Sequence, residues 1–136
     1  MSILYSAFIK KESSYGHYKK VLAQCKAFSE ETKQEVYFPY IENNKLITTK
    51  IYNNLVEIYD EKEIILNQLN SKLKGLNLRK EYFLHIENLT EKLKIKIVYA
   101  RRMEGTLPIV FDIYKKIKEK KIKLVYEIPT YPFFDE

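Results

Sequence analysis

The sequence contains a single cysteine, Cys25, so an internal disulfide is excluded and a reducing compartment is favoured. Tryptophan is absent, and no apolar run approaches the roughly 20 residues that a membrane-spanning helix needs. The opening residues, MSILYSAF, lack a basic leader and a small-residue cleavage site, so we expect no signal peptide. Together these absences predict a cytoplasmic protein.

Glycine and histidine are also scarce, which excludes several common kinds of site. Gly16 is alone in the loop after the first predicted strand, so this loop is neither a dinucleotide-binding fingerprint nor a P-loop. His17 and His85 are the only histidines, and neither has metal-ligand spacing to a partner. No Gly-x-Ser-x-Gly elbow is present, and Cys25 has no obvious base. We therefore predict no metal site and assign no catalytic residue.

Charge is plentiful, and its balance is basic. The 136 residues carry a net charge of +6, with 46% hydrophobic and 31% charged residues, as expected for one globular domain. Much of the excess lies in one stretch, YKKIKEKKIK, which contains Lys115, Lys116, Lys118, Lys120, Lys121 and Lys123. This stretch fits either a solvated helix end or a surface that approaches anionic lipid head groups. Motifs of nucleic-acid binding are missing, so we expect no nucleic-acid partner.

Hydrophobic periodicity predicts strands and helices that alternate at both ends of the chain. Residues 2–8 are apolar on both faces, as in a central parallel strand. An amphipathic helix follows, with Cys25 on its apolar stripe and Ser13 or Ser14 as its N-cap. EVYFPY then predicts a second strand.

The middle of the chain is less regular. Two Asn-Asn pairs separate β-branched stretches within residues 41–60, which indicates hairpin strands. From Glu61 to Leu93 the pattern is helical, with apolar stripes on either side of Gly75, and fits one kinked helix or two.

Regular alternation returns after residue 93. KIKIVYARR predicts a strand, residues 107–120 a helix with Val110 and Phe111 on its apolar stripe, and KLVYEIP another strand. The whole order predicts an α/β fold. We expect a doubly wound, mostly parallel Rossmann-like sheet with helices on both faces and hairpin strands in the middle.

Polar side chains follow three of the predicted parallel strands, and ligands of such sheets bind at the carboxyl ends of the strands. The loop after the first strand enters a helix N-terminus, where exposed N–H groups hold phosphates in other proteins; it contains Ser13, Ser14, Tyr15, Gly16 and His17. At the other two strand ends we expect a binding surface formed by Arg101, Arg102, Glu127, Thr130 and Tyr131. One of the two arginines could instead pair with Glu104. We expect the three strand ends to lie on one rim.

The last forty residues resemble a known family. The strand end Tyr99-Ala100-Arg101, the helix after it and the stretch EIPTYPF from Glu127 to Phe133 are similar to the N-terminal half of bacterial glycosyltransferases of family 4. The likeness is specific at residues 97–136 and weaker at residues 1–38. Phe133 stands where the family usually has Tyr, and Tyr15 precedes Gly16 where many relatives have two glycines.

The resemblance implies a two-domain enzyme that transfers a sugar from a nucleotide-sugar donor with retention, without a metal or another cofactor. Residues 1–136 would be its acceptor-side Rossmann-like domain, and the nucleotide-sugar domain would be absent from this chain. The loop of residues 13–17 would border the donor phosphates, and the residues at the other strand ends would line the acceptor side. The acceptor would be a saccharide or a lipid-linked saccharide in capsule or exopolysaccharide synthesis, at the inner face of the membrane. The fragment alone would be inactive.

A second hypothesis does not depend on the resemblance. The chain could be a stand-alone α/β binding module whose lysine-rich helix docks on anionic membranes or on protein partners. A small phosphatase or nucleotide-binding regulator of flavodoxin-like shape has only the fold class in its favour, and the expected nucleophile and phosphate loop are missing.

Overall fold

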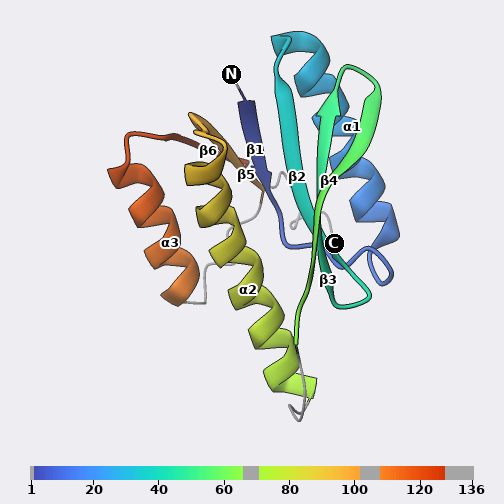
Figure 1. Cartoon of the computed structure of the whole chain (residues 1–136), viewed down its shortest axis with the longest axis vertical. Helices are drawn as coiled ribbons and strands as arrows, with labels where there is room; N and C mark the ends of the chain where they lie inside the picture. Colours follow the sequence, from blue (N-terminus) through green and yellow to red (C-terminus); the bar gives the residue numbers. More distant parts are fainter. Residues whose placement is uncertain (1, 66–70, 102–107, 128–136) are drawn as a thin grey trace, which may run out of the picture.

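The computed structural model describes residues 2–65, 71–101 and 108–127, which form an α/β fold around one mixed sheet (Figure 1). Six strands lie in the order β4-β3-β2-β1-β5-β6. They are β1 (Ser2–Ser6), β2 (Glu35–Glu42), β3 (Lys45–Tyr52), β4 (Leu55–Glu63), β5 (Ile97–Arg101) and β6 (Lys123–Glu127). The described helices are α1 (Tyr15–Thr32), α2 (Ser71–Lys92) and α3 (Pro108–Glu119).

The sheet is mostly parallel, as the sequence predicts. The central strand β1 runs parallel to both β2 and β5, and β5 runs parallel to β6. The strands β3 and β4 add to β2 as antiparallel hairpins, so the predicted hairpins are confirmed. Asn43 and Asn44, between β2 and β3, both have positive φ, 50° and 59°. Tight hairpin turns need this conformation, and Asn adopts it at low cost.

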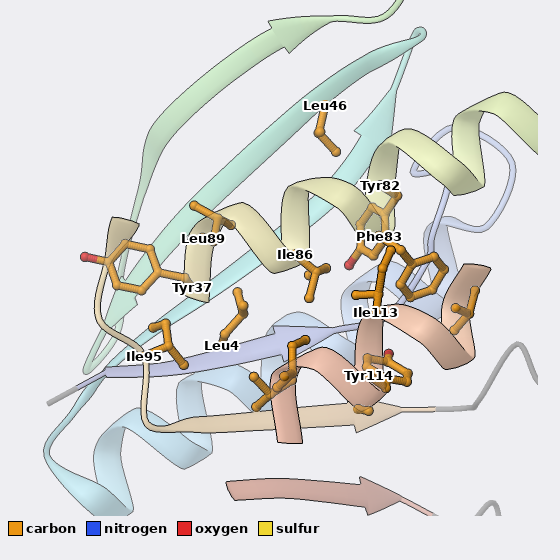
Figure 2. Packing of buried hydrophobic residues seen from close by; sticks show 14 of the residues in the cluster. Leu4, Tyr37, Leu46, Tyr82, Phe83, Ile86, Leu89, Ile95, Ile113 and Tyr114 are labelled. Atoms are coloured by element: carbon orange, nitrogen blue, oxygen red, sulfur yellow. The ribbon is translucent and has the colours of Figure 1, made fainter. Parts of the chain in front are cut away.

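Helices cover both faces of the sheet (Figure 1). Side chains alternate along a strand, so in β1 Ile3 and Tyr5 pack with α1 while Leu4 packs with α2 and α3. Figure 2 shows the larger cluster, in which Leu4 of the sheet meets Ile86 of α2 and Ile113 of α3. Each fully buried aliphatic side chain of this kind contributes about 1.5–3 kcal/mol of transfer free energy. Cys25 is fully buried against the sheet, as predicted.

Two details of the prediction are wrong. Residues 61–63 do not begin a helix but extend β4, where they pair with Lys45–Ile47 of β3. Gly75, where the sequence fits one kinked helix or two, lies inside one helix, because α2 continues through it from Ser71. Phe111 is exposed, and the buried stripe of α3 is formed by Val110, Ile113, Tyr114 and Ile117. These four are spaced so that they share one face of the helix.

Candidate functional site

The carboxyl ends of β1, β5 and β6 lie side by side, at the end of the sheet where the parallel strands finish. The strands are parallel neighbours, with Ser6 beside Ala100 and Arg101 beside Glu127. The chain therefore delivers the last side chains of three strands to a common rim, as the sequence predicts. Arg101 and Glu127 are the last residues of β5 and β6, so they lie at the rim itself.

Arg101 and Glu127 form an ion pair. The Nε of Arg101 lies 3.0 Å from Oε2 of Glu127, and the two side chains are 21% and 26% exposed. This partial burial makes the pair stronger than a fully solvated one, while leaving it accessible to a ligand. Arg101 and Glu127 come from two of the predicted strand ends. They are in contact because the register of β5 and β6 places them opposite each other.

Tyr99 and Gln24 hold the other oxygen of the carboxylate. Tyr99 donates its hydroxyl hydrogen to Oε1 of Glu127 over 2.9 Å, and Nε2 of Gln24 donates to the same atom over 3.1 Å. Both carboxylate oxygens are therefore engaged by donors. A carboxylate held in this way is suited to orient a guanidinium and a phenol, and less suited to take a proton from a substrate.

Tyr5, in the core beneath the sheet surface, fixes the position of Gln24. Its ring is fully buried and its hydroxyl donates to Oε1 of Gln24, which fixes the amide so that Nε2 points at Glu127. Burial raises the pKa of the Tyr5 hydroxyl, and its hydrogen bond with Arg101 opposes the rise only in part. Burial, together with the hydrogen bond to Glu127, also raises the pKa of Tyr99. Both phenols therefore stay protonated at neutral pH and act as donors.

Gln24 was not among the residues predicted from the sequence. It lies on the inner side of α1, three residues after the buried Val21 and four before Phe28, which packs on the same core. A polar side chain at this spacing, inside an otherwise apolar stripe, is the signal that would have identified it.

The loop predicted to border donor phosphates also lies at the carboxyl ends of the strands, but on the other side of β1 from β5. After β1 the chain pairs with β2, because Ile41 donates its N–H to Ile9 and Lys11 donates to Ile41. This path leads away from β5 and β6. The predicted residues Ser13, Ser14, Tyr15, Gly16 and His17 therefore follow a segment that is bonded to β2, on the side of β1 away from β5 and β6.

The sequence predicts Ser13 or Ser14 as the N-cap of α1, and Ser14 takes this position. Its side chain, however, makes no capping hydrogen bond. The hydroxyl of Ser13 donates to the carbonyl of Lys10 instead, over 3.5 Å. Gly16 has an ordinary backbone conformation, and a Cβ at this position would point into open space, so the fold does not require glycine there.

The lysine-rich stretch lies near the amino-terminal ends of β5 and β6, whereas the ion pair lies at their carboxyl ends. Lys123, the first residue of β6, pairs with Ile97, the first residue of β5. Lys120 forms ion pairs with Glu87 and Glu91 of α2, while Lys115, Lys116, Lys118 and Lys121 are exposed. These lysines therefore do not contribute to the rim that carries Arg101.

His85 is a buried part of the core that faces β3. Its Nε2 lies 2.8 Å from Oγ1 of Thr48, and burial lowers the pKa of the imidazole to about 4. It is therefore neutral at physiological pH and fits a structural role. Within the described ranges, no group of three or more His, Cys, Asp or Glu side chains is arranged to hold a metal ion.

Arg102, Thr130 and Tyr131 were also predicted to bind the acceptor, and Glu104 was considered as a partner for an arginine. All four lie outside the described residues. None of the helices in the part of the chain that the structure describes is both long and apolar enough to cross a membrane.

Comparison with known proteins gives no relative: no family model, no curated protein and no solved structure matches this chain.

Proposed function

We propose that this chain is the acceptor-side domain of a retaining glycosyltransferase of family 4. In this proposal the α/β sheet is a doubly wound Rossmann-like domain, and a second domain, outside this chain, holds the nucleotide sugar. The enzyme would transfer a hexose to a saccharide or lipid-linked acceptor during synthesis of a bacterial surface polysaccharide. The resemblance of residues 97–136 is the source of the family assignment.

The observation that supports the proposal is the Arg101–Glu127 pair at the carboxyl edge of the parallel strands. Both residues belong to the two stretches that carry the resemblance, and the structure brings them into contact. A guanidinium oriented by a carboxylate and flanked by the Tyr99 hydroxyl offers hydrogen-bond donors to sugar hydroxyls or to a phosphate. Such a group favours binding and orientation of an acceptor over proton transfer.

The direct test is sugar transfer by the full-length protein. Labelled nucleotide sugars are supplied one at a time with lipid-linked and polysaccharide acceptors, and label in the product is counted. Arg101→Lys keeps the charge but loses the planar fork, so we expect turnover to fall by about tenfold or more. A full-length protein that transfers no sugar from any donor, or that has no second domain beyond residue 136, would contradict the proposal.

Lys50→Gln is a matched control for this test. Lys50 pairs with Glu35 over 2.9 Å. Glu35 is the first residue of β2, so this pair lies at the amino-terminal end of that strand, away from the carboxyl ends that carry Arg101. Unlike Arg101→Lys, this variant removes the whole charge from a partly exposed ion pair, but the pair lies away from Arg101, so turnover should be unchanged. An equal loss of turnover in both variants would show that Arg101 acts only through folding.

The second candidate function, docking of a stand-alone domain on anionic membranes, is supported by the exposed lysines at the end of α3. Each lysine near an anionic surface is worth about 1 kcal/mol, and salt screens the attraction. Sedimentation with liposomes that contain phosphatidylserine should then retain the chain at low salt and release it at high salt. Equal sedimentation with neutral and anionic liposomes would exclude this function.

A further inference from the structure

The strand β4 forms one outer edge of the sheet. It pairs with β3 on one side, and within the described residues no strand pairs with its other side. In an antiparallel strand alternate residues direct their backbone N–H and C=O groups away from the neighbour. The outer side of β4 therefore presents a row of backbone donors and acceptors to which another strand can add.

The first half of β4 is apolar and exposed. Leu55 is 68% exposed and Ile58 is 60% exposed, and Val56 is also open to solvent. Natural edge strands are usually protected by charges, by proline or by a covering segment. None of these devices protects Leu55, Val56 and Ile58 among the described residues, apart from the single Glu57 between them.

A bulge separates this half from an acidic second half. The register shifts between Thr48 and Thr49, so that Tyr59 has no residue opposite it on β3. The ring of Tyr59 packs edge-on against Tyr37, with Lys92 over its face, and this contact holds Tyr59 on the α2 side. The bulge increases the local twist and ends the apolar run at Ile58.

The charge of β4 opposes that of the rest of the chain. Residues 55–63 contain four carboxylates and one lysine, a net charge of −3, whereas the whole chain carries +6. Glu57 and Glu63 lie opposite Lys50 and Lys45 of β3, which offset them. Asp60 and Glu61 lie opposite Thr48 and Ile47, so no cation of β3 offsets their charge.

These observations exclude a second copy of the chain as the best occupant of this edge. Pairing of two β4 strands would bring together two segments that each carry −3. Like charges on facing strands are destabilising. A partner strand that complements β4 must instead combine basic residues with β-branched or other apolar ones.

We propose that the outer edge of β4 is a strand-addition site for an extended basic and apolar segment of a protein partner. Added antiparallel, the partner places basic residues beside Asp60 and Glu61 and apolar residues beside Val56 and Ile58. Backbone hydrogen bonds along the edge supply affinity, and the side chains set the specificity. This proposal does not depend on the glycosyltransferase assignment.

The test measures binding of a fluorescein-labelled peptide of 9 residues, the length of β4, by fluorescence anisotropy. The probe has Arg, Lys and Arg followed by alternating Thr and Val. A second peptide replaces its basic residues with Glu, and a third carries Pro at two central positions. We expect saturable binding of the first peptide and at least tenfold weaker binding of the other two. Equal binding of all three peptides, or no binding of the first, would overturn the proposal.

Substitutions locate the site on the protein. Ile58→Lys places a charge on the exposed apolar half and should weaken binding by roughly tenfold or more, the equivalent of one buried aliphatic side chain. Ile65→Lys is the matched control: Ile65 is 78% exposed and lies outside β4, so binding should not change. Both positions are exposed, and thermal unfolding checks that both variants remain folded.

Two further measurements complete the test. Asp60→Asn with Glu61→Gln should weaken binding and reduce its dependence on salt, because the charge attraction is lost. Sedimentation equilibrium of the chain without peptide should give a monomer. A dimer that Ile58→Lys dissociates would overturn the proposal in favour of self-association, and so would unchanged peptide binding in Ile58→Lys.

Discussion

The Tyr82 hydroxyl of α2 bridges two backbone groups, the carbonyl of Pro39 in β2 and the N–H of Ala7, which directly follows β1. The Tyr82 hydroxyl donates to the carbonyl of Pro39 over 2.8 Å and accepts from the N–H of Ala7 over 3.0 Å. The pairing of β1 with β2 ends before Pro39, at Leu4 and Tyr37. A side chain from a helix thus joins two strands at the point where they separate.

We therefore predict that Tyr82→Phe destabilises the protein by about 2–4 kcal/mol, since two buried backbone groups lose their partner. Urea unfolding followed by circular dichroism measures the change, and the m-value should stay constant. Tyr15→Phe is the control, because Tyr15 is exposed. Equal midpoints for the two variants would show that water or a backbone shift replaces the Tyr82 hydroxyl.

The buried His85 predicts a loss of stability in mild acid. Its pKa is about 4 in the folded protein, because burial disfavours the cation, whereas an unfolded histidine titrates near 6.5. Above pH 6.5 both states hold the neutral ring, so stability is full. Between pH 6.5 and about 4 only the unfolded state gains a proton. The free energy of unfolding should therefore fall by roughly 1.4 kcal/mol per pH unit at its steepest.

Chemical denaturation of the wild type and His85→Gln at pH 7 and pH 5 isolates this effect. The Gln side chain keeps a polar partner for Thr48 but does not titrate, so the variant should lose less stability between the two pH values. A wild-type slope in His85→Gln would assign the acid sensitivity to other groups.

The sequence predicts the elements near both ends of the chain well, because the sequence patterns that indicate them are local. Apolar runs of strand length predict β1, β5 and β6, and helical periodicity predicts α1 and α3. The two Asn-Asn pairs predict the hairpins, since Asn adopts the left-handed conformation of Asn43 and Asn44 at lower cost than most other non-glycine residues.

The errors arise where distant contacts decide the structure. Residues 61–63 are charged and could be helical, and only their pairing with β3 makes them a strand. Phe111 fits a helical stripe as well as Ile113 does, and only the position of α2 and the sheet selects Ile113 for burial. The site follows the same rule. Arg101 and Glu127 were predicted from their strand ends. Their direct contact depends on the register of β5 and β6, and the hydrogen bond from Gln24 depends on the packing of α1 on the sheet.

A double-mutant cycle on Arg101 and Glu127 should give a coupling free energy of about 1 kcal/mol. The pair is partly buried, and Tyr99 and Gln24 fix its geometry, so little side-chain entropy is lost when it forms. Arg101→Met, Glu127→Gln and the double variant are compared by urea unfolding. Lys62 and Glu81 form a reference pair at 4.0 Å with Lys62 largely exposed, and their coupling should be near zero. Similar coupling free energies for both pairs would mean that Tyr99 and Gln24 do not strengthen the interaction between Arg101 and Glu127.

Gly16→Ala separates the stability of α1 from the proposed binding of donor phosphates. Gly16 has an ordinary φ inside the first turn of α1, and a Cβ there would meet nothing within 4 Å. Alanine is favoured over glycine in helices by up to about 1 kcal/mol, so the variant should be as stable as the wild type or more stable. If the loop of residues 13–17 approaches the donor phosphates in the full-length enzyme, the added methyl group should raise KM for the nucleotide sugar. Ala27→Gly, at an exposed position of the same helix, should lower stability and leave KM unchanged. A Gly16→Ala enzyme with greater stability and an unaltered KM would place the donor phosphates elsewhere on the rim, because a backbone that approaches an anion closely has no room for the methyl group.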